Sequence, residues 1–304
     1  MQQELIKNLI EYIESHADRG ATWTSVAKAM GLSVSTLTQF RDEKYVGNVE
    51  RIASKIDRFL KMEEERRTGP QGIPFAATRN ARTVMTMCDY AVTFGAMAMV
   101  TGRAGFGKTY ALKEFARQNP NTHYILVNQT FSFTVVLKRM CKALGLSPEG
   151  SSSEMYDRLV EKLAGSDRLF IFDEAQEFNF RSFEIVRNIY DETGIGIVLA
   201  GDHRLYERIQ GIGSRMRTDR NFDQLYSRIK QHQVLKPFSA KDVGLILHSI
   251  FGEVPDEVVA YAAAEVRGSG RNLENVIENM QIRGIDEFSK KEFDVAREYA
   301  VLAA

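Results

Sequence analysis

The spacing of hydrophobic residues at the start of the chain predicts a small all-helical domain over residues 1–62. In the first predicted helix, apolar side chains recur at intervals of three and four residues, at Leu5, Ile6, Leu9, Ile10 and Ile13. A later helix is expected to begin after Asn48, whose side chain can cap it, with its apolar face at Ile52, Ile56, Phe59 and Leu60. The charge run and turn residues "EEERRTGPQGIPF", at 63–75, cannot bury a face, so this segment is interpreted as a linker.

Between these helices, "VAKAMGLSVSTLTQF" predicts two short helices joined by a tight turn. The first would bury Val26, Ala27 and Met30, and the second would bury Val34, Leu37 and Phe40. Gly31 can adopt the positive φ of the turn, and Ser33 can cap the second helix. The arrangement resembles the helix-turn-helix of phage-repressor-type proteins, whose second helix enters the major groove of DNA.

The outward side of that second helix carries groups that can bond phosphates and base edges. The candidate DNA-binding residues are Ser33, Ser35, Thr36, Thr38 and Gln39, flanked by the cations Lys28, Arg41 and Lys44. Positive and negative charges balance in this module, so weak or sequence-tolerant binding to DNA is expected rather than tight operator recognition. A helical bundle used for protein contacts is the alternative.

From residue 76 to residue 236, short apolar strands alternate with amphipathic helices, which predicts an α/β core built on a parallel sheet with both faces covered. The predicted strands are 96–100, 123–128, 169–172, 194–202 and 232–236, and the predicted helices between them include 131–144, 154–164 and 181–192. Residues 237–304 are helical by pattern and are expected to form an all-α lid, with capping boxes at Ser239 with Asp242 and at Ser289 with Glu292.

Composition places the chain among ordinary soluble proteins. It has 304 residues, of which 44% are hydrophobic and 26% charged, and no apolar run is long enough to span a membrane. The first residues do not form a secretory signal, and two scattered cysteines suit a reducing compartment, so a cytoplasmic location is expected. The net charge of zero excludes a protein coated in positive charge, although the stretch from Gly201 to Lys241 holds nine basic and four acidic side chains.

The sequence "GRAGFGKTY" lies between a predicted strand and a predicted helix, which is the context of a phosphate-binding loop. The glycines allow the backbone to curl so that its N–H groups point at phosphates. Lys108 is expected to neutralise the β- and γ-phosphates of ATP, and the Thr109 hydroxyl to coordinate Mg²⁺. The residues predicted to bind the nucleotide are Gly102, Arg103, Ala104, Gly105, Phe106, Gly107, Lys108, Thr109 and Tyr110.

An acid pair follows the buried strand in "RLFIFDEAQ". Asp173 is expected to hold Mg²⁺, and Glu174 to act as the general base that polarises the attacking water. The alternative is an acid pair that only caps the next turn. Because this pair lies downstream of a glycine loop, we favour a role in the hydrolysis of ATP.

The order of these motifs resembles that of AAA+ ATPases, in which a polar residue at the end of the next strand senses the γ-phosphate. Asp202 stands at that place, where relatives usually carry Asn. A carboxylate there repels phosphate unless it is protonated or shared with Mg²⁺ or an arginine, so slow or partner-dependent hydrolysis is expected. His203 is the alternative sensor.

The same resemblance implies two catalytic arginines, which would meet the charge that develops on the phosphate. The segment "DQLYSRI" resembles the one that supplies an arginine to a neighbouring subunit, which selects Arg228. Arg215, Arg217 and Arg220 are the alternatives, as is plain surface charge. The segment "GSGRNLENVIENM" resembles the lid helix that brings Arg271 to the nucleotide. A lid and a shared arginine together imply a homo-oligomer whose assembly is set by ATP.

Nearly the whole chain resembles the phage Mu transposition protein B family of transposon target-selection ATPases. The resemblance rests on "GLSVSTLTQF", "KYVGN", "GRAGFGKT", "FDEAQ", "GIGIVLAGDHRLY" and "LYSRI". It implies an ATP-dependent protein that binds double-stranded DNA largely without sequence preference, forms helical filaments on it, delivers target DNA to a transposase and is stimulated by that transposase. It also gives the basic stretch a role, because Arg215 and Arg217 would then contact DNA phosphates.

Two other functions compete with this one. In the first, the helical front module binds a specific operator sequence and the ATPase core controls that binding, which would make the protein a transcriptional regulator. In the second, the chain is a secretion-associated AAA+ ATPase, a class that usually carries membrane spans or a cell-wall-binding module.

Overall fold

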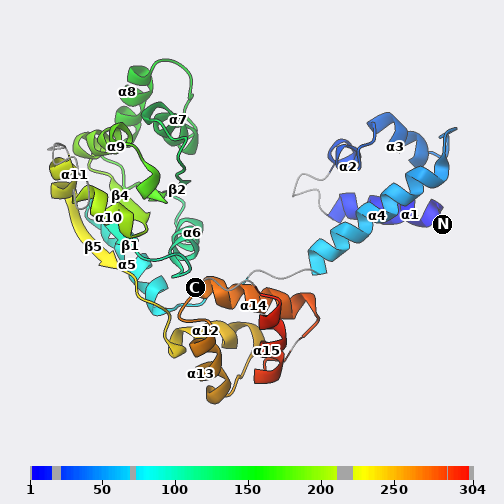
Figure 1. Cartoon of the computed structure of the whole chain (residues 1–304). Helices are drawn as coiled ribbons and strands as arrows, with labels where there is room; N and C mark the ends of the chain where they lie inside the picture. The colour runs from blue at the N-terminus through cyan, green and yellow to red at the C-terminus, as the bar shows by residue number, and fades with distance from the viewer. Residues whose placement is uncertain (1, 16–21, 69–72, 211–221, 286, 301–304) are drawn as a thin grey trace. The chain divides into compact units, whose positions relative to one another are not determined.

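The computed structural model describes residues 2–15, 22–68, 73–210, 222–285 and 287–300. The chain divides into two compact units, Met1–Gly72 and Ile73–Ala304 (Figure 1). Helix α4 (Val49–Thr68) continues into the charge run at 63–68, so the first part of the segment interpreted as a linker is helical. Glutamate and arginine are good helix formers, so a run of them can continue a helix.

The described residues of the first unit form the helices α1 (Gln2–Ser15), α2 (Trp23–Ala29), α3 (Val34–Arg41) and α4. Its core contains Leu9, Ala27, Leu37 and Ile56, each at most 1% exposed, as the hydrophobic spacing predicts. The turn between α2 and α3 places Gly31 at φ +61°, a conformation that glycine adopts without a steric penalty.

Two capping predictions in this unit are confirmed and one burial prediction is wrong. The Ser33 hydroxyl accepts the Thr36 N–H at 3.1 Å, and the Asn48 side chain accepts the Arg51 N–H at 2.8 Å. Val34, however, is 38% exposed rather than buried. It is the first residue of α3, so it lies one turn beyond the part of the helix that packs on the core.

The second unit contains a five-stranded sheet in which every pairing is parallel, as predicted. The strands are β1 (Met97–Thr101), β2 (Thr122–Leu126), β3 (Leu169–Asp173), β4 (Gly196–Gly201) and β5 (Ile229–Val234). Their spatial order is β2-β3-β4-β1-β5. Because β3, β4 and β1 are neighbours, the acid pair, Asp202 and the glycine loop follow adjacent strands at one edge of the sheet.

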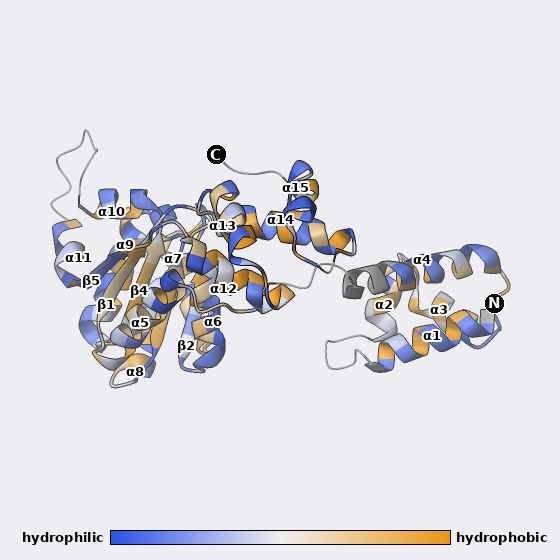
Figure 2. Cartoon of the chain, turned by 90° about the horizontal axis from the view of Figure 1, so that it is seen from below, coloured by the Kyte–Doolittle hydropathy of each residue, from blue (hydrophilic) through white to orange (hydrophobic). Residues whose placement is uncertain are grey.

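Alternate residues of β1, β3 and β4 pack in two separate hydrophobic cores, one on each face of the sheet, as expected when both faces are covered. Met97 and Met99 pack with α7 (Phe133–Ala143), α8 (Ser152–Leu163) and α9 (Phe180–Thr193). Ala98 and Val100 pack with α5 (Arg79–Thr93) and α6 (Lys108–Gln118). Figure 2 shows the hydrophobic colour concentrated on the central strands.

Helix α5 is not among the predicted elements, although its sequence carries a readable apolar face at Ala81, Val84, Met87, Cys88 and Ala91. It contacts β1 and β4 and packs along α6, so it supports the strand and the helix that flank the glycine loop. Strand β5 begins three residues earlier than predicted.

The lid consists of α12 (Ala240–Phe251), α13 (Asp256–Glu265), α14 (Gly270–Ile282) and α15 (Lys290–Glu298), around a core that includes Leu247, Leu273 and Phe293. The capping box of Ser239 with Asp242 is confirmed, and Ser289 caps α15 by accepting the Glu292 N–H at 3.2 Å. Within the described residues, no helix is both long and apolar enough to cross a membrane.

Candidate nucleotide-binding site

A cavity of about 370 Å³ lies between the glycine loop, the segment before α5 and the lid. This volume falls in the range of small-molecule sites, about 300–1,000 Å³. One part of its wall is apolar and includes Ile73, Pro74, Phe238 and Ile246, whereas Lys108, Glu174 and Arg271 form its charged part. An apolar part suits a flat base, and a charged part suits phosphates.

The glycine loop supplies most of its predicted contacts to this cavity. The loop residues that line it are Ala104, Gly105, Gly107, Lys108, Thr109 and Tyr110. The Phe106 side chain is instead buried in the core beneath the loop, and Arg103 is exposed. Gly105 and Gly107 have φ values of +82° and +80°, which side chains rarely tolerate, so the curl of the loop depends on glycine here.

Lys108 is buried, with 6% of its surface exposed. Its ammonium donates to the carbonyls of Gly102, at 2.6 Å, and Arg103, at 3.1 Å. Burial lowers the pKa of Lys108, while the nearby carboxylates of Glu174 and Asp173 act in the opposite direction. The ammonium therefore lies among acceptors that phosphate oxygens can replace.

The predicted Mg²⁺ ligands lie together at the end of β3. The Thr109 hydroxyl donates to the Asp173 carboxylate at 2.6 Å, and Asp173 is fully buried. No group of three metal-binding His, Cys, Asp or Glu side chains occurs in the described part of the chain. Mg²⁺ is commonly held by one or two protein oxygens together with nucleotide phosphates, so this hydroxyl–carboxylate pair fits the ion.

Tyr124 of β2 belongs to the same cluster, although no sequence motif marks it. Its hydroxyl donates to the Asp173 carboxylate at 2.9 Å. Burial raises the pKa of Tyr124, and the Asp173 charge raises it further, so the phenol stays protonated and remains a donor. Only the pairing of β2 with β3 brings these two residues together, because they are far apart in sequence.

Glu174, the predicted general base, faces the cavity. Its backbone is left-handed, with φ 58° and ψ 36°, a conformation that costs an ordinary residue about 1–2 kcal/mol and that is concentrated at functional sites. Its N–H donates to the Asp173 carboxylate at 3.0 Å. The Gln176 side-chain amide donates to its carboxylate.

Asp202, at the end of β4, shares its carboxylate with an arginine, which is one of the arrangements that lets a carboxylate lie near phosphate. It caps α10 (His203–Ile209) by accepting the Arg204 N–H at 2.9 Å, and the Arg204 guanidinium pairs with it at 2.8 Å. Neither Asp202 nor His203 lines the cavity.

Arg271, near the start of α14 in the lid, lines the cavity. The Gly270 N–H donates to the Gly105 carbonyl at 2.7 Å, which fixes the start of α14 against the glycine loop. Ser269 caps α14 by accepting the Asn272 N–H at 3.3 Å. The positive end of a helix and a guanidinium are therefore held beside the loop, where both favour an anion.

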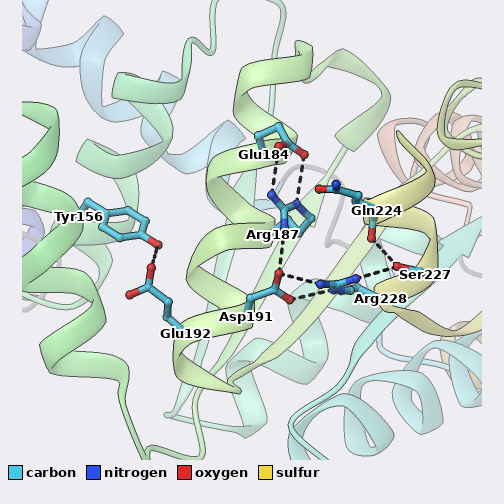
Figure 3. A network of polar contacts seen from close by, with 8 residues as sticks. All are labelled: Tyr156, Glu184, Arg187, Asp191, Glu192, Gln224, Ser227 and Arg228. Carbon is cyan, nitrogen blue, oxygen red and sulfur yellow. Dashed lines mark hydrogen bonds and ion pairs between the residues drawn. The ribbon is translucent and has the colours of Figure 1, made fainter. Parts of the chain in front are cut away.

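Arg228 does not reach this cavity. Figure 3 shows it at the end of α11 (Phe222–Arg228), paired with Asp191 of α9. The two Arg228–Asp191 contacts are 3.0 and 3.2 Å, and Arg187 donates to the same carboxylate at 2.8 Å. The Arg228 side chain is 39% exposed, so it remains accessible from outside the chain.

The candidate DNA-binding residues of the first unit lie on its surface or at its edge. Lys28, Ser33, Ser35, Gln39 and Lys44 are exposed, and Thr36, Thr38 and Arg41 are partly exposed. Several of these residues already have partners within the unit. The Ser33 hydroxyl bonds those of Ser35 and Thr36, the Thr38 hydroxyl donates to the Val34 carbonyl, and the Arg41 guanidinium pairs with Asp42 at 2.8 Å. Arg215, Arg217 and Arg220 lie outside the described residues.

The glycine loop, acid pair and helical lid on a parallel sheet define an ATPase of the AAA type. The family model described as an AAA domain matches residues 95–209. In fold, the chain is similar to a Walker-type ATPase of Pyrococcus abyssi, with a TM-score of 0.51 and 17% identity over 71% of each chain.

Within this class, the resemblance to the phage Mu transposition protein B family is confirmed by two curated homologues. The chain is 24% identical over 269 residues to the Mu-like prophage FluMu DNA transposition protein B of Haemophilus influenzae, covering 87% of this chain and 92% of the relative. It is 29% identical over 227 residues to the ATP-dependent target DNA activator B of Escherichia phage Mu, covering 74% of this chain and 72% of the relative.

Proposed function

We propose that this ATPase binds double-stranded DNA in its ATP-bound state, assembles on it as a homo-oligomeric filament without strong sequence preference, and presents it as the target to a transposase that it activates. The observation that carries the proposal is the cavity in which Lys108, Glu174 and Arg271 meet, together with relatives named as a DNA transposition protein and an ATP-dependent target DNA activator. ATP then acts as the signal for assembly.

In this proposal, each site residue has one task. Thr109 and Asp173 would hold Mg²⁺, which would supply positive charge to offset that of the nucleotide phosphates. Lys108 exchanges its carbonyl partners for phosphate oxygens, and Arg271 approaches from the lid. Glu174 accepts a proton from water as that water attacks the γ-phosphorus and the bond to ADP breaks. Arg228 serves the site of a neighbouring subunit, which requires it to leave Asp191.

The decisive experiment compares binding to arbitrary DNA duplexes of different lengths with ATP and with ADP, followed by electron microscopy of the same samples. Binding that needs ATP, strengthens with length and ignores sequence is the expected result. A sequence-specific footprint would instead support the ATP-gated regulator, with α3 of the first unit reading an operator.

Two variants test the link between the nucleotide and assembly. Glu174→Gln keeps the shape of the side chain but cannot accept the proton, so it is expected to bind ATP and to stay trapped on DNA. Rapid disassembly of that variant would contradict the general-base role. Lys108→Ala is expected to lose ATP-dependent assembly. Normal filaments of this variant would contradict the proposal that ATP binding drives assembly.

Contacts to DNA phosphates are tested through the salt dependence of binding. Arg215→Ala or Arg217→Ala is expected to weaken binding to every sequence and to reduce the salt slope by about one for each phosphate that the protein no longer neutralises. Arg181→Ala, an exposed arginine of α9 outside the basic stretch, is the matched control. If the salt slope of DNA binding changes no more than in this control, Arg215 and Arg217 do not contact DNA phosphates.

A further inference from the structure

The side chain of Gln176 connects the predicted general base to the end of a neighbouring strand. It follows the acid pair in a short 3₁₀ turn, Ala175–Glu177, and only 4% of its surface is exposed. Its amide N–H donates to the Glu174 carboxylate, and its carbonyl accepts the Asp202 N–H at 3.3 Å. One buried amide therefore contacts both the candidate base and the backbone of the candidate γ-phosphate sensor.

The hydrogen-bond partners of the Gln176 amide determine where its oxygen and its nitrogen lie. The Asp202 N–H can only donate and an ionised carboxylate can only accept, so the carbonyl must face Asp202 and the NH₂ must face Glu174. Gly201 leaves the space for this arrangement, because a Cβ at that position would lie 2.3 Å from the Gln176 carbonyl oxygen. The amide is thus held by a hydrogen bond at each end.

The turn that carries Gln176 is itself held by α10. The Arg208 guanidinium donates to the Gln176 backbone carbonyl and to the Phe178 carbonyl, the latter at 2.8 Å. The Arg204 guanidinium, already paired with Asp202, also contacts the Glu177 carboxylate at 3.2 Å. The helix after β4 and the turn after β3 therefore form one connected polar network beside the cavity.

We propose that Gln176 is a positioning residue for hydrolysis, which orients the Glu174 carboxylate toward the attacking water and couples it to the end of β4. Gln176 does not line the cavity, so it acts through Glu174. This inference rests on the proposed role of Glu174.

The test is the pH profile of steady-state ATP hydrolysis by the full chain with duplex DNA, measured for Gln176→Glu and Gln176→Ala. In Gln176→Glu, the new carboxyl group donates to Glu174 only while it is protonated, and the two carboxylates repel each other once both are ionised. Its kcat is therefore expected to fall at least about tenfold relative to the wild type as pH rises from about 6 to about 8. Gln176→Ala is expected to lower kcat across this range with little change in KM.

Gln118→Glu is the matched control, because Gln118 also donates to a glutamate, Glu114, at 2.7 Å, but on the exposed surface of α6. Its pH profile should follow the wild type. If both Gln176 variants bind ATP and keep the wild-type kcat and pH profile while Glu174→Gln is inactive, Gln176 has only a packing role. If Glu174→Gln hydrolyses ATP normally, the base has been assigned to the wrong residue, and the inference fails with it.

Discussion

The contact between the glycine loop and the lid can be tested by adding one methyl group at Gly105. An alanine at φ +82° costs about 1–2 kcal/mol, because the left-handed conformation crowds its Cβ. That Cβ would also lie 2.5 Å from the Ser269 hydroxyl, which must move and so give up its cap on α14, at a further cost of about 0.5–2 kcal/mol. Gly105→Ala should therefore lower the free energy of unfolding of the second unit by about 1.5–4 kcal/mol.

Gly145→Ala provides the matched control. Gly145 has a φ of +70°, but a Cβ at this position would have no atom of the described residues within 4 Å. The substitution should cost only the backbone strain, about 1–2 kcal/mol. Because the lid contact is strained only at Gly105, affinity for ATP should fall in Gly105→Ala and stay unchanged in Gly145→Ala.

The assay is urea unfolding followed by far-UV circular dichroism, with ATP affinity measured separately by titration. The single tryptophan, Trp23, lies in the first unit, so its fluorescence should report the same transition in every variant. Adding Ser269→Gly to Gly105→Ala removes the clashing hydroxyl and should restore part of the lost stability, because glycine is a tolerated N-cap. Equal stability of the two alanine variants, or no recovery in the double variant, would refute the reasoning.

Three further predictions concern other parts of the molecule. Leu37→Ala should destabilise the first unit by about 2–5 kcal/mol, seen by Trp23 fluorescence, and leave ATP affinity unchanged. Burial lowers the pKa of His232 in the folded chain. As pH falls, His232 therefore binds a proton at about pH 6.5 in the unfolded chain, but only at a lower pH in the folded chain. The second unit should therefore lose stability as pH falls from about 7 to 5, and His232→Gln should reduce that loss in urea unfolding. Asp202→Asn keeps a side chain that can cap α10 and removes a negative charge, so the hydrolysis rate should rise; a lower rate would show that the Asp202–Arg204 pair assists catalysis.

The sequence predicts what depends on local pattern and known motifs. The five strands, the loop and the acid pair are each marked by a short apolar run or a glycine pattern, and they occur within a few residues of their predicted bounds. The apolar spacing of α5 is equally clear, so this helix could be predicted in the same way. Periodicity alone does not show where the core ends along a helix, which is why it misplaces Val34.

The polar partners of the site are harder to predict, since they depend on pairing between distant segments. Tyr124 reaches Asp173 only through the pairing of β2 with β3, and Asp191 meets Arg228 across 37 residues of sequence. Gln176 is only two residues from Glu174, but the contact requires the left-handed turn at Glu174. Arg204 is the exception, because an arginine two residues after Asp202 can be recognised in the sequence.

The chain's only two cysteines, Cys88 and Cys141, are both free and fully buried. Burial raises the pKa of both thiols, so the reactive thiolate is scarce at neutral pH. A maleimide dye would therefore select a cysteine newly placed on the surface, for example at Lys44 in the first unit and Lys142 in the second, both exposed. The wild-type background thus already suits single-molecule fluorescence, in which energy transfer between two such dyes would report whether the distance between the units changes when ATP is added.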